Sequence, residues 1–285
     1  MRPADPAPLR CRWVVLGRPQ RRESLAVTSL VDIHSHLLPG IDDGPDDLEG
    51  SLDMARTAAA AGVKMMAATP HLRADFPGVD LEALPDQCEA LRRSVRDAGI
   101  ALKVVGGAEA SVMWALEASD EQLKLASYGQ RGKDLLIETP NDVSMVENIL
   151  FAIRSKGFRI TLAHPERQPV FQEDPSRLER LGEQGVLLQI NATALLHRRR
   201  PYGRLAEHLV RSGLVHAVSS DGHRASQWRA VTELADGLEV LSEMVGPHRA
   251  RWLCSSAPAA ILTGVALPPA PPIVASTGWR GWFQR

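Results

Sequence analysis

Short apolar segments alternate with helical patterns about seven times along this chain, and this alternation limits the fold more than any other feature. Each apolar segment is short and is typical of a strand buried in a parallel sheet. We place these strands at 30–34, 63–69, 102–106, 134–138, 159–163, 186–190 and 214–219. Strands that alternate with helices in this way predict a parallel α/β sheet, either open or closed into a barrel.

The segments between the strands carry apolar residues at helical spacing. The first helix is expected after Gly44-Pro45, where Asp46 and Asp47 favour a helix N-terminus. Further helices are predicted at 80–98, 143–156, 175–184, 202–212, 226–245 and 247–262. Because α/β barrels reach roughly 250 residues as one unit, we expect a single domain over 29–263.

The two ends of the chain differ from this regular centre. Prolines and arginines crowd residues 1–28, which show no periodicity, so we expect a disordered N-terminal extension there. Four prolines between positions 268 and 272 stop the last helix and predict a Pro-rich C-terminal tail over 264–285.

Composition excludes several classes of protein. The chain has 285 residues with 44% hydrophobic and 24% charged, as in ordinary globular proteins, and its net charge of -1 does not suit a nucleic-acid-binding protein. Three scattered cysteines form no Cys-x-x-Cys pair, so a reduced, cytoplasmic setting is expected. A transmembrane segment is not expected, because no run of roughly 18 apolar residues occurs.

Ionisable side chains follow six of the seven predicted strands at their C-terminal ends. These residues are Asp32, His34, His36, His71, Glu109, Glu138, His164, Glu166, Asp221 and His223. Ligands of parallel α/β folds bind at this edge of the sheet, so the side chains are expected to lie close together. Taken singly, each histidine is better explained as a hydrogen-bonded core residue. Together, imidazoles and carboxylates in this number suit divalent Zn, Mn or Fe and predict a site for two or three ions.

Other chemistries lack their motifs. A cysteine phosphatase loop needs Arg at the sixth position after Cys, but Gly17, Ser94 and Ala260 occupy these positions. Neither a Gly-x-Ser-x-Gly elbow nor a Gly-x-Gly-x-x-Gly motif occurs, and the glycine spacing at 129–134 is too short for a P-loop. With these motifs missing, the predicted metal cluster is the feature that the sequence favours.

The order of these residues resembles the PHP (polymerase and histidinol phosphatase) superfamily, whose fold is a distorted (β/α)7 TIM-like barrel with a trinuclear metal site. Within that superfamily, the chain is similar to the bacterial metal-dependent protein-tyrosine phosphatases of the CpsB/YwqE type, which are encoded with capsule and exopolysaccharide genes. The resemblance covers about residues 30–262 and rests on DIHSHLLPGIDDGP (32–45), ATPH (68–71), GAE (107–109), IE (137–138), AHPER (163–167) and SSDGH (219–223).

The resemblance implies a manganese-dependent enzyme, with Fe or Zn as other candidate ions. It assigns His34, His36, Glu109 and Asp221 to a first ion, Glu109, Glu138 and His164 to a second, and Asp43, His71 and His223 to a third. Asp42, next to Asp43, is an alternative ligand, and Asp32 would support the ligands from behind. Such ions lower the pKa of bound water from near 16 to about 7 and hold phosphate oxygens.

The resemblance also implies a substrate, the phosphorylated tyrosine-rich tail of a bacterial tyrosine autokinase that controls polysaccharide export. The planar guanidinium of Arg binds two phosphate oxygens at once, so Arg167 is the first candidate to hold the phosphate and Arg73 the second. A solvated surface arginine is the alternative for both. Two other functions stay open, a phosphoesterase acting on histidinol phosphate or a nucleotide and a non-catalytic binding barrel. A homo-oligomer also stays open.

Overall fold

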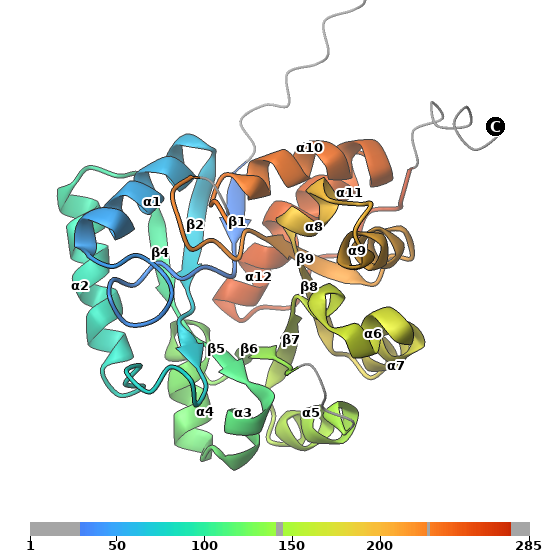
Figure 1. Ribbon diagram of the computed structural model, residues 1–285, viewed down its shortest axis with the longest axis horizontal. Helices are drawn as coiled ribbons and strands as arrows, with labels where there is room; N and C mark the ends of the chain where they lie inside the picture. The colour runs from blue at the N-terminus through green and yellow to red at the C-terminus, as the bar shows by residue number, and fades with distance from the viewer. Residues whose placement is uncertain (1–28, 141–144, 227–228, 275–285) are drawn as a thin grey trace, which may run out of the picture.

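The structure of the chain is a computed structural model that describes residues 29–140, 145–226 and 229–274. The predicted N-terminal extension over 1–28 and the end of the predicted tail, from residue 275, lie outside the described residues. Parallel strands lie at the centre of the molecule and helices surround them (Figure 1).

The described strands form two parallel sheets, one with the order β1-β2-β4 and the other with the order β3-β5-β6-β7-β8-β9. Their bounds are β1 (Leu30–Asp32), β2 (Val63–Ala68), β3 (His71–Leu72), β4 (Lys103–Gly106), β5 (Glu109–Ser111), β6 (Asp134–Glu138), β7 (Arg159–Ala163), β8 (Leu187–Asn191) and β9 (Val215–Ser219). A strand lies in each of the seven predicted positions. The two short strands β3 and β5 were not predicted, because segments of two or three residues show no periodicity.

The two sheets are neighbours along the chain and in space. Only residues 69–70 separate β2 from β3, and only 107–108 separate β4 from β5, so these pairs continue one another across a break. On the other side, Ser35 pairs with Gly222 in a parallel bridge, and the His36 N–H donates to the Gly222 carbonyl at 2.9 Å. The segment after β1 therefore contacts the segment after β9, and both sheets border one interior.

Helices follow most of the strands and cover the outer side of the sheets (Figure 1). Their bounds are α1 (Leu48–Ala60), α2 (Leu84–Asp97), α3 (Val112–Glu117), α4 (Asp120–Ala126), α5 (Val146–Ser155), α6 (Pro169–Glu173), α7 (Ser176–Glu183), α8 (Ala192–Leu196), α9 (Pro201–Arg211), α10 (Glu233–Val245), α11 (Pro247–Arg251) and α12 (Ala257–Thr263). Helical turns of other types lie at η1 (Tyr128–Gln130), η2 (Pro165–Arg167) and η3 (Trp252–Ser256).

The predicted helices agree with the observed helices in position, but several of their ends differ. Asp47 caps α1, as its position in the sequence predicts. Its carboxylate accepts a hydrogen bond from the Gly50 N–H at 2.9 Å. The helix predicted over 226–245 begins only at Glu233, and the one predicted over 247–262 is divided by the π-helical turn η3. The helices α3, α4, α6 and α8 have only five to seven residues each, too few for a clear period in the sequence.

Successive strand residues face two different apolar cores. Leu135 of β6 belongs to the larger core between strands and helices, while Leu136 faces the interior enclosed by the strands. Ile261 and Leu262 of α12 belong to this inner core. Apolar side chains thus fill the lower part of the interior, and the ionisable residues gather at the C-terminal ends of the strands.

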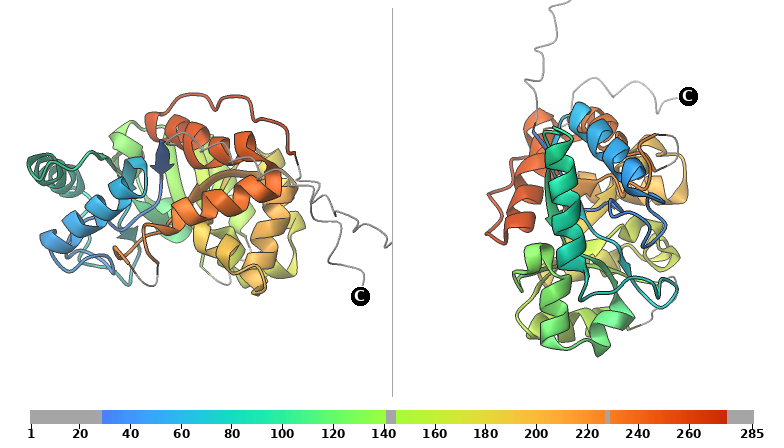
Figure 2. Two further views of the ribbon diagram at one scale, coloured as in Figure 1. Left: turned by 90° about the horizontal axis from the view of Figure 1, so that it is seen from above. Right: turned by 90° about the vertical axis from the view of Figure 1, so that its left-hand side faces the viewer.

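Residues 265–274 run across the opposite side of the molecule, at the N-terminal ends of the strands (Figure 2). Arg159, at the start of β7, donates to the Val265 carbonyl at 2.8 Å, and Trp252 Nε1 donates to the Pro268 carbonyl at 3.0 Å. The first part of the predicted tail is therefore packed on the domain. Among the described residues, none of the helices has the length and hydropathy needed to span a bilayer.

His216 of β9 gives the first testable prediction. Its Nδ1 accepts a hydrogen bond from the Leu188 N–H at 3.2 Å, and burial together with Arg249 lowers its pKa to about 4. In the unfolded chain this histidine has an ordinary pKa of about 6.5, so it is protonated there before it is protonated in the folded chain. The free energy of unfolding therefore falls by up to about 3 kcal/mol as the pH decreases from about 6.5 to about 4. We expect urea titrations of chelated protein to show a weaker pH dependence for His216→Gln than for the unsubstituted chain. An unchanged dependence would contradict this.

Candidate metal centre

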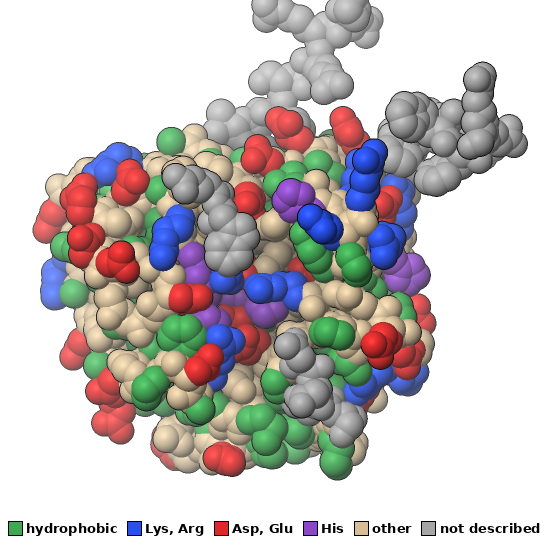
Figure 3. Space-filling view, in the orientation of Figure 1, with side chains coloured by type: hydrophobic (Ala, Val, Ile, Leu, Met, Phe, Trp, Pro, Cys, Tyr) green, Lys and Arg blue, Asp and Glu red, His purple; other side chains and the backbone are tan. Residues whose placement is uncertain are grey.

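The C-terminal ends of the strands bring all nine predicted ligands into one cluster. In the space-filling view, histidine side chains gather in a hollow at the centre of one face, with arginines and acidic groups around them (Figure 3). The nine residues are His34, His36, Asp43, His71, Glu109, Glu138, His164, Asp221 and His223. They fall into four overlapping groups, and within each group the ligand atoms lie within 4.8 Å of one another.

The segment after β1 shows why the local sequence points two imidazoles into the site. His34 and His36 lie two residues apart in extended chain, so both side chains face the same side. Ser35 between them turns the other way, and its Oγ donates to the Ala67 carbonyl at 2.5 Å. Asp32 is not in any of the ligand groups. Its carboxylate instead accepts from the His34 N–H at 3.2 Å and from the Ser220 N–H, which ties the chain after β1 to the chain after β9.

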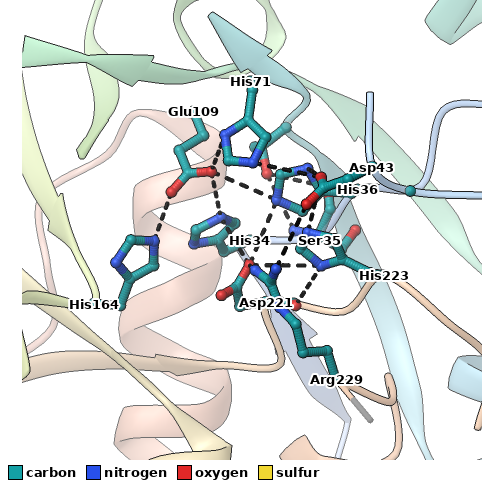
Figure 4. Close-up of polar contacts among 12 residues, drawn as sticks. His34, Ser35, His36, Asp43, His71, Glu109, His164, Asp221, His223 and Arg229 are labelled. Atoms are coloured by element: carbon teal, nitrogen blue, oxygen red, sulfur yellow. Dashed lines mark hydrogen bonds and ion pairs between the residues drawn. The ribbon is translucent and has the colours of Figure 1, made fainter. Parts of the chain in front are cut away.

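Two of the predicted ligands have an unusual backbone conformation. His164, after β7, has φ of +32°, and Asp221, after β9, has φ of +51°. Non-glycine residues rarely adopt this left-handed region, and such residues concentrate at functional sites. The turn at each strand end directs the side chain back over the rim, where it meets the other ligands (Figure 4).

Glu109 lies at the middle of the cluster (Figure 4). Its Oε1 is 2.6 Å from His164 Nε2, and its Oε2 is 2.8 Å from His71 Nδ1 and 3.3 Å from His34 Nε2. A carboxylate with different partners on its two oxygens is suited to bridge two ions. Glu138 joins the same region, with Oε1 3.5 Å from His71 Nδ1.

The adjacent carboxylates Asp42 and Asp43 take different places. Asp43 Oδ1 lies 3.0 Å from His223 Nε2 and 3.5 Å from His71 Nε2, so this carboxylate faces the cluster. Asp42 Oδ2 instead lies 2.7 Å from His36 Nδ1, behind the imidazole ring. A carboxylate behind a histidine holds the ring so that its other nitrogen is free to bind a metal. The geometry therefore favours Asp43 as the ligand.

Among the described residues, several buried side-chain atoms of the predicted ligands have no hydrogen-bond partner. They are His34 Nε2, His36 Nε2, His71 Nδ1, Glu109 Oε2, His164 Nδ1 and His223 Nε2. Leaving a buried polar atom unpaired costs about 1–3 kcal/mol, so such a concentration needs a reason. Nitrogen and carboxylate oxygen donors that converge without partners fit divalent transition-metal ions.

The histidines and carboxylates of the cluster shift one another's pKa values. Burial opposes protonation of His71, but the nearby carboxylates of Asp43 and Glu109 raise its pKa to about 12. Burial also opposes protonation of His36, but the nearby carboxylates of Asp221 and Asp42 raise its pKa to about 10. The pKa values of Glu109 and Asp221 lie well below the usual range because the neighbouring histidines outweigh the effect of burial. A metal ion that binds here would displace protons from these imidazoles, so its affinity is expected to fall at low pH.

Three arginines line the cavity above the cluster, which has a volume of about 600 Å³. Arg73 Nη1 donates to both oxygens of Glu138, at 2.9 and 3.1 Å. The half-exposed Arg167 donates from Nη1 to Asp221 Oδ2 at 3.0 Å. Arg229 was not predicted. Its Nη2 donates to Asp221 Oδ1 at 2.6 Å, yet it lies in a loop without periodicity, so nothing in the sequence distinguished it from other arginines.

A comparison with known protein families decides the relationship. The family described as "Capsular polysaccharide synthesis, CpsB/CapC" matches residues 30–263, which is most of the chain. The chain belongs to the CpsB/CapC family. The predicted resemblance to CpsB/YwqE-type proteins is thereby confirmed.

Relatives within the CpsB/CapC family carry names that state an activity. Tyrosine-protein phosphatase YwqE of Bacillus subtilis is 30% identical over 231 residues, which cover 80% of this chain and 90% of that protein. Tyrosine-protein phosphatase CpsB of Streptococcus agalactiae is 24% identical over 234 residues, covering 79% of this chain and 94% of that protein.

Solved structures agree with the sequence relationship. A structure described among those of YwqE from Bacillus subtilis and CpsB from Streptococcus pneumoniae, "unique metal-dependent tyrosine phosphatases", superimposes with a TM-score of 0.74 at 27% identity. The match covers 87% of this chain and all of that one (100%). A β-aspartyl dipeptidase from Fervidobacterium islandicum AW-1 matches with a TM-score of 0.51 at 13% identity, a likeness of fold alone.

Proposed function

We propose that this member of the CpsB/CapC family hydrolyses phosphotyrosine on protein with the help of divalent metal ions. The observation that carries the proposal is the convergence of nine His, Asp and Glu side chains, six of which have a buried donor atom without a hydrogen-bond partner. The names of the YwqE and CpsB relatives support the same activity.

We assign the fold to the distorted (β/α)7 barrels of the PHP superfamily. The seven predicted strand positions all hold strands, and β3 and β5 continue β2 and β4 past short breaks. The bridge between Ser35 and Gly222 supports closure of the ring between its first and last strands near the rim.

Manganese ions, two or three in number, are the proposed cofactors. His34, His36, Glu109 and Asp221 would hold one ion, with Glu109 shared with an ion at Glu138 and His164, and Asp43, His71 and His223 would hold the third. When bound, such ions lower the pKa of water and neutralise phosphate oxygens. The ligand side chains fix the positions of the ions, and Asp42 fixes the orientation of His36.

The chain's own arginines would bind the substrate phosphate. Arg167 lines the cavity with an exposed side chain, and Arg73 and Arg229 line the same cavity. Met113 and Pro140 also line this cavity and offer apolar surface to an aromatic ring. We infer that the substrate is the phosphorylated tail of a bacterial tyrosine kinase in the cytoplasm, because relatives are named for tyrosine phosphatase activity and the family for capsular polysaccharide synthesis.

Purified protein tests this proposal directly. With Mn²⁺ we expect rapid release of phosphate from a phosphotyrosine peptide and much slower release from histidinol phosphate. A chelator should abolish activity, and added Mn²⁺ should restore it. Faster turnover of histidinol phosphate would instead support a small-molecule phosphoesterase, and absence of bound metal would support a non-catalytic protein.

Thiol chemistry should play no part in the reaction. Cys88 and Cys254 are buried, and burial raises the pKa of the Cys88 thiol to about 11. Neither residue lines the cavity above the metal cluster, and Cys11 lies outside the described residues. A variant with all three cysteines changed to Ser is expected to keep its phosphotyrosine turnover and its sensitivity to chelation. A folded but inactive variant would overturn the metal-based mechanism.

A further inference from the structure

One strand of the larger sheet supplies no proposed metal ligand. β8 turns Gln189 and Asn191 toward the site, and both side chains are buried. The residues opposite Gln189 on the neighbouring strands are Ala163 of β7 and Ala217 of β9. These small side chains leave space for the longer Gln189 side chain to cross the interior toward β1.

Gln189 and Asn191 connect two proposed ligands from opposite ends of the chain. Gln189 Oε1 lies 3.1 Å from His34 Nδ1. Gln189 Nε2 donates to Asn191 Oδ1 at 2.9 Å, and Asn191 Nδ2 donates to Asp221 Oδ2 at 2.7 Å. We name this series of hydrogen bonds from His34 to Asp221 the amide relay.

The carboxylate at one end determines the direction of every hydrogen bond in the relay. An ionised Asp221 can only accept hydrogen bonds, so Asn191 must turn its NH₂ group toward it and its oxygen toward Gln189. Gln189 must then donate to Asn191 and present its own oxygen to His34. Only a protonated ring nitrogen can donate to that oxygen, so Nδ1 of His34 carries the hydrogen.

We propose that Gln189 and Asn191 are positioning residues that set the tautomer of His34 and the orientation of Asp221 for metal binding. The ligand atoms that the relay does not use lie close together: His34 Nε2, which makes no hydrogen bond, is 3.4 Å from Asp221 Oδ1, which accepts from Arg229 Nη2. One relay thus prepares two donor atoms for one ion. The inference rests on the proposed metal centre and adds β8 to the strands that build it.

Two substitutions interrupt the relay at different links. Gln189→Met keeps a similar volume and removes both hydrogen bonds of the side chain, and Asn191→Leu removes the donor to Asp221. Thr161→Val is the matched control, because Thr161 is fully buried on the neighbouring strand β7 and its Oγ1 makes no hydrogen bond. In Mn²⁺ titrations followed by electron paramagnetic resonance, we expect each relay variant to bind about 10–100-fold more weakly and the control to bind like the unsubstituted chain.

The double variant separates a relay from independent packing effects. Breaking either link interrupts the same chain of hydrogen bonds, so Gln189→Met with Asn191→Leu should lose about as much Mn²⁺ affinity as the weaker-binding single variant. In Zn²⁺-loaded protein, nuclear magnetic resonance should show a His34 Nδ1 proton that is protected from exchange. That protection should be lost in Gln189→Met and kept in Thr161→Val.

The outcomes distinguish the relay from the metal centre. If the unsubstituted chain binds neither Mn²⁺ nor Zn²⁺, the proposed centre itself is wrong. If it binds metal and both relay variants bind equally tightly, the relay is refuted while the centre stands. Fully additive losses, or a His34 ring protonated at Nε2 in the Zn²⁺ form, would also overturn the relay.

Discussion

A His36→Asn variant is expected to stay folded and to lose more than about 100-fold in phosphotyrosine turnover, since even residues behind metal ligands commonly contribute 10–100-fold. Asparagine can still donate to Asp42, where His36 Nδ1 now lies 2.7 Å from the carboxylate. It has no atom at the position of Nε2, which is buried, unpartnered and 3.5 Å from both Glu109 and Asp221. The variant therefore removes one ligand atom and keeps the support behind it.

Metal analysis and thermal unfolding complete this test. We expect lower Mn²⁺ content in His36→Asn and a melting temperature of the chelated protein close to that of the unsubstituted chain. His208→Ala is the control, because His208 is half-exposed on α9 and is not part of the cluster. Normal turnover and full metal content in His36→Asn would remove His36 from the proposed ligand set.

Replacing Arg167 by Ala should reduce kcat/KM for a phosphotyrosine peptide by on the order of 100-fold, the scale found when one preorganised donor to a developing charge is removed. Mn²⁺ content should not change, because Asp221 keeps its hydrogen bonds from Asn191 and Arg229. Arg167→Lys should recover only part of the loss, since an ammonium group lacks the planar fork.

The measurement pairs steady-state kinetics with metal analysis of the same samples. Arg180→Ala provides the control, because Arg180 is an exposed arginine on α7 outside the cavity. Parallel loss of metal and activity in Arg167→Ala would instead assign Arg167 to the support of Asp221. Unchanged kinetics would make it a surface arginine without a role in the reaction.

The strands and the clustering of ionisable residues at one rim could be predicted because both follow from local properties of the chain. Seven apolar segments correspond to strands, and ionisable residues follow six of them. His34 and His36 face the same side because extended chain alternates with a period of two, which is visible in three letters of sequence. Parallel strands then bring their C-terminal ends to one rim, so ligands such as His164 and Asp221 meet without any long-range information.

Only the tertiary structure decided how the ligands are supported. Asp42 and Asp43 are adjacent in the sequence and chemically equivalent there, yet one lies behind His36 and the other faces His223. Arg229 and Gln189 also carry no local signal, because their roles depend on which strand lies opposite and on the small side chains beside them. The period of a strand determines the side to which a residue points, whereas its partner across the interior depends on register, twist and the loops between, which are set when the whole fold packs together.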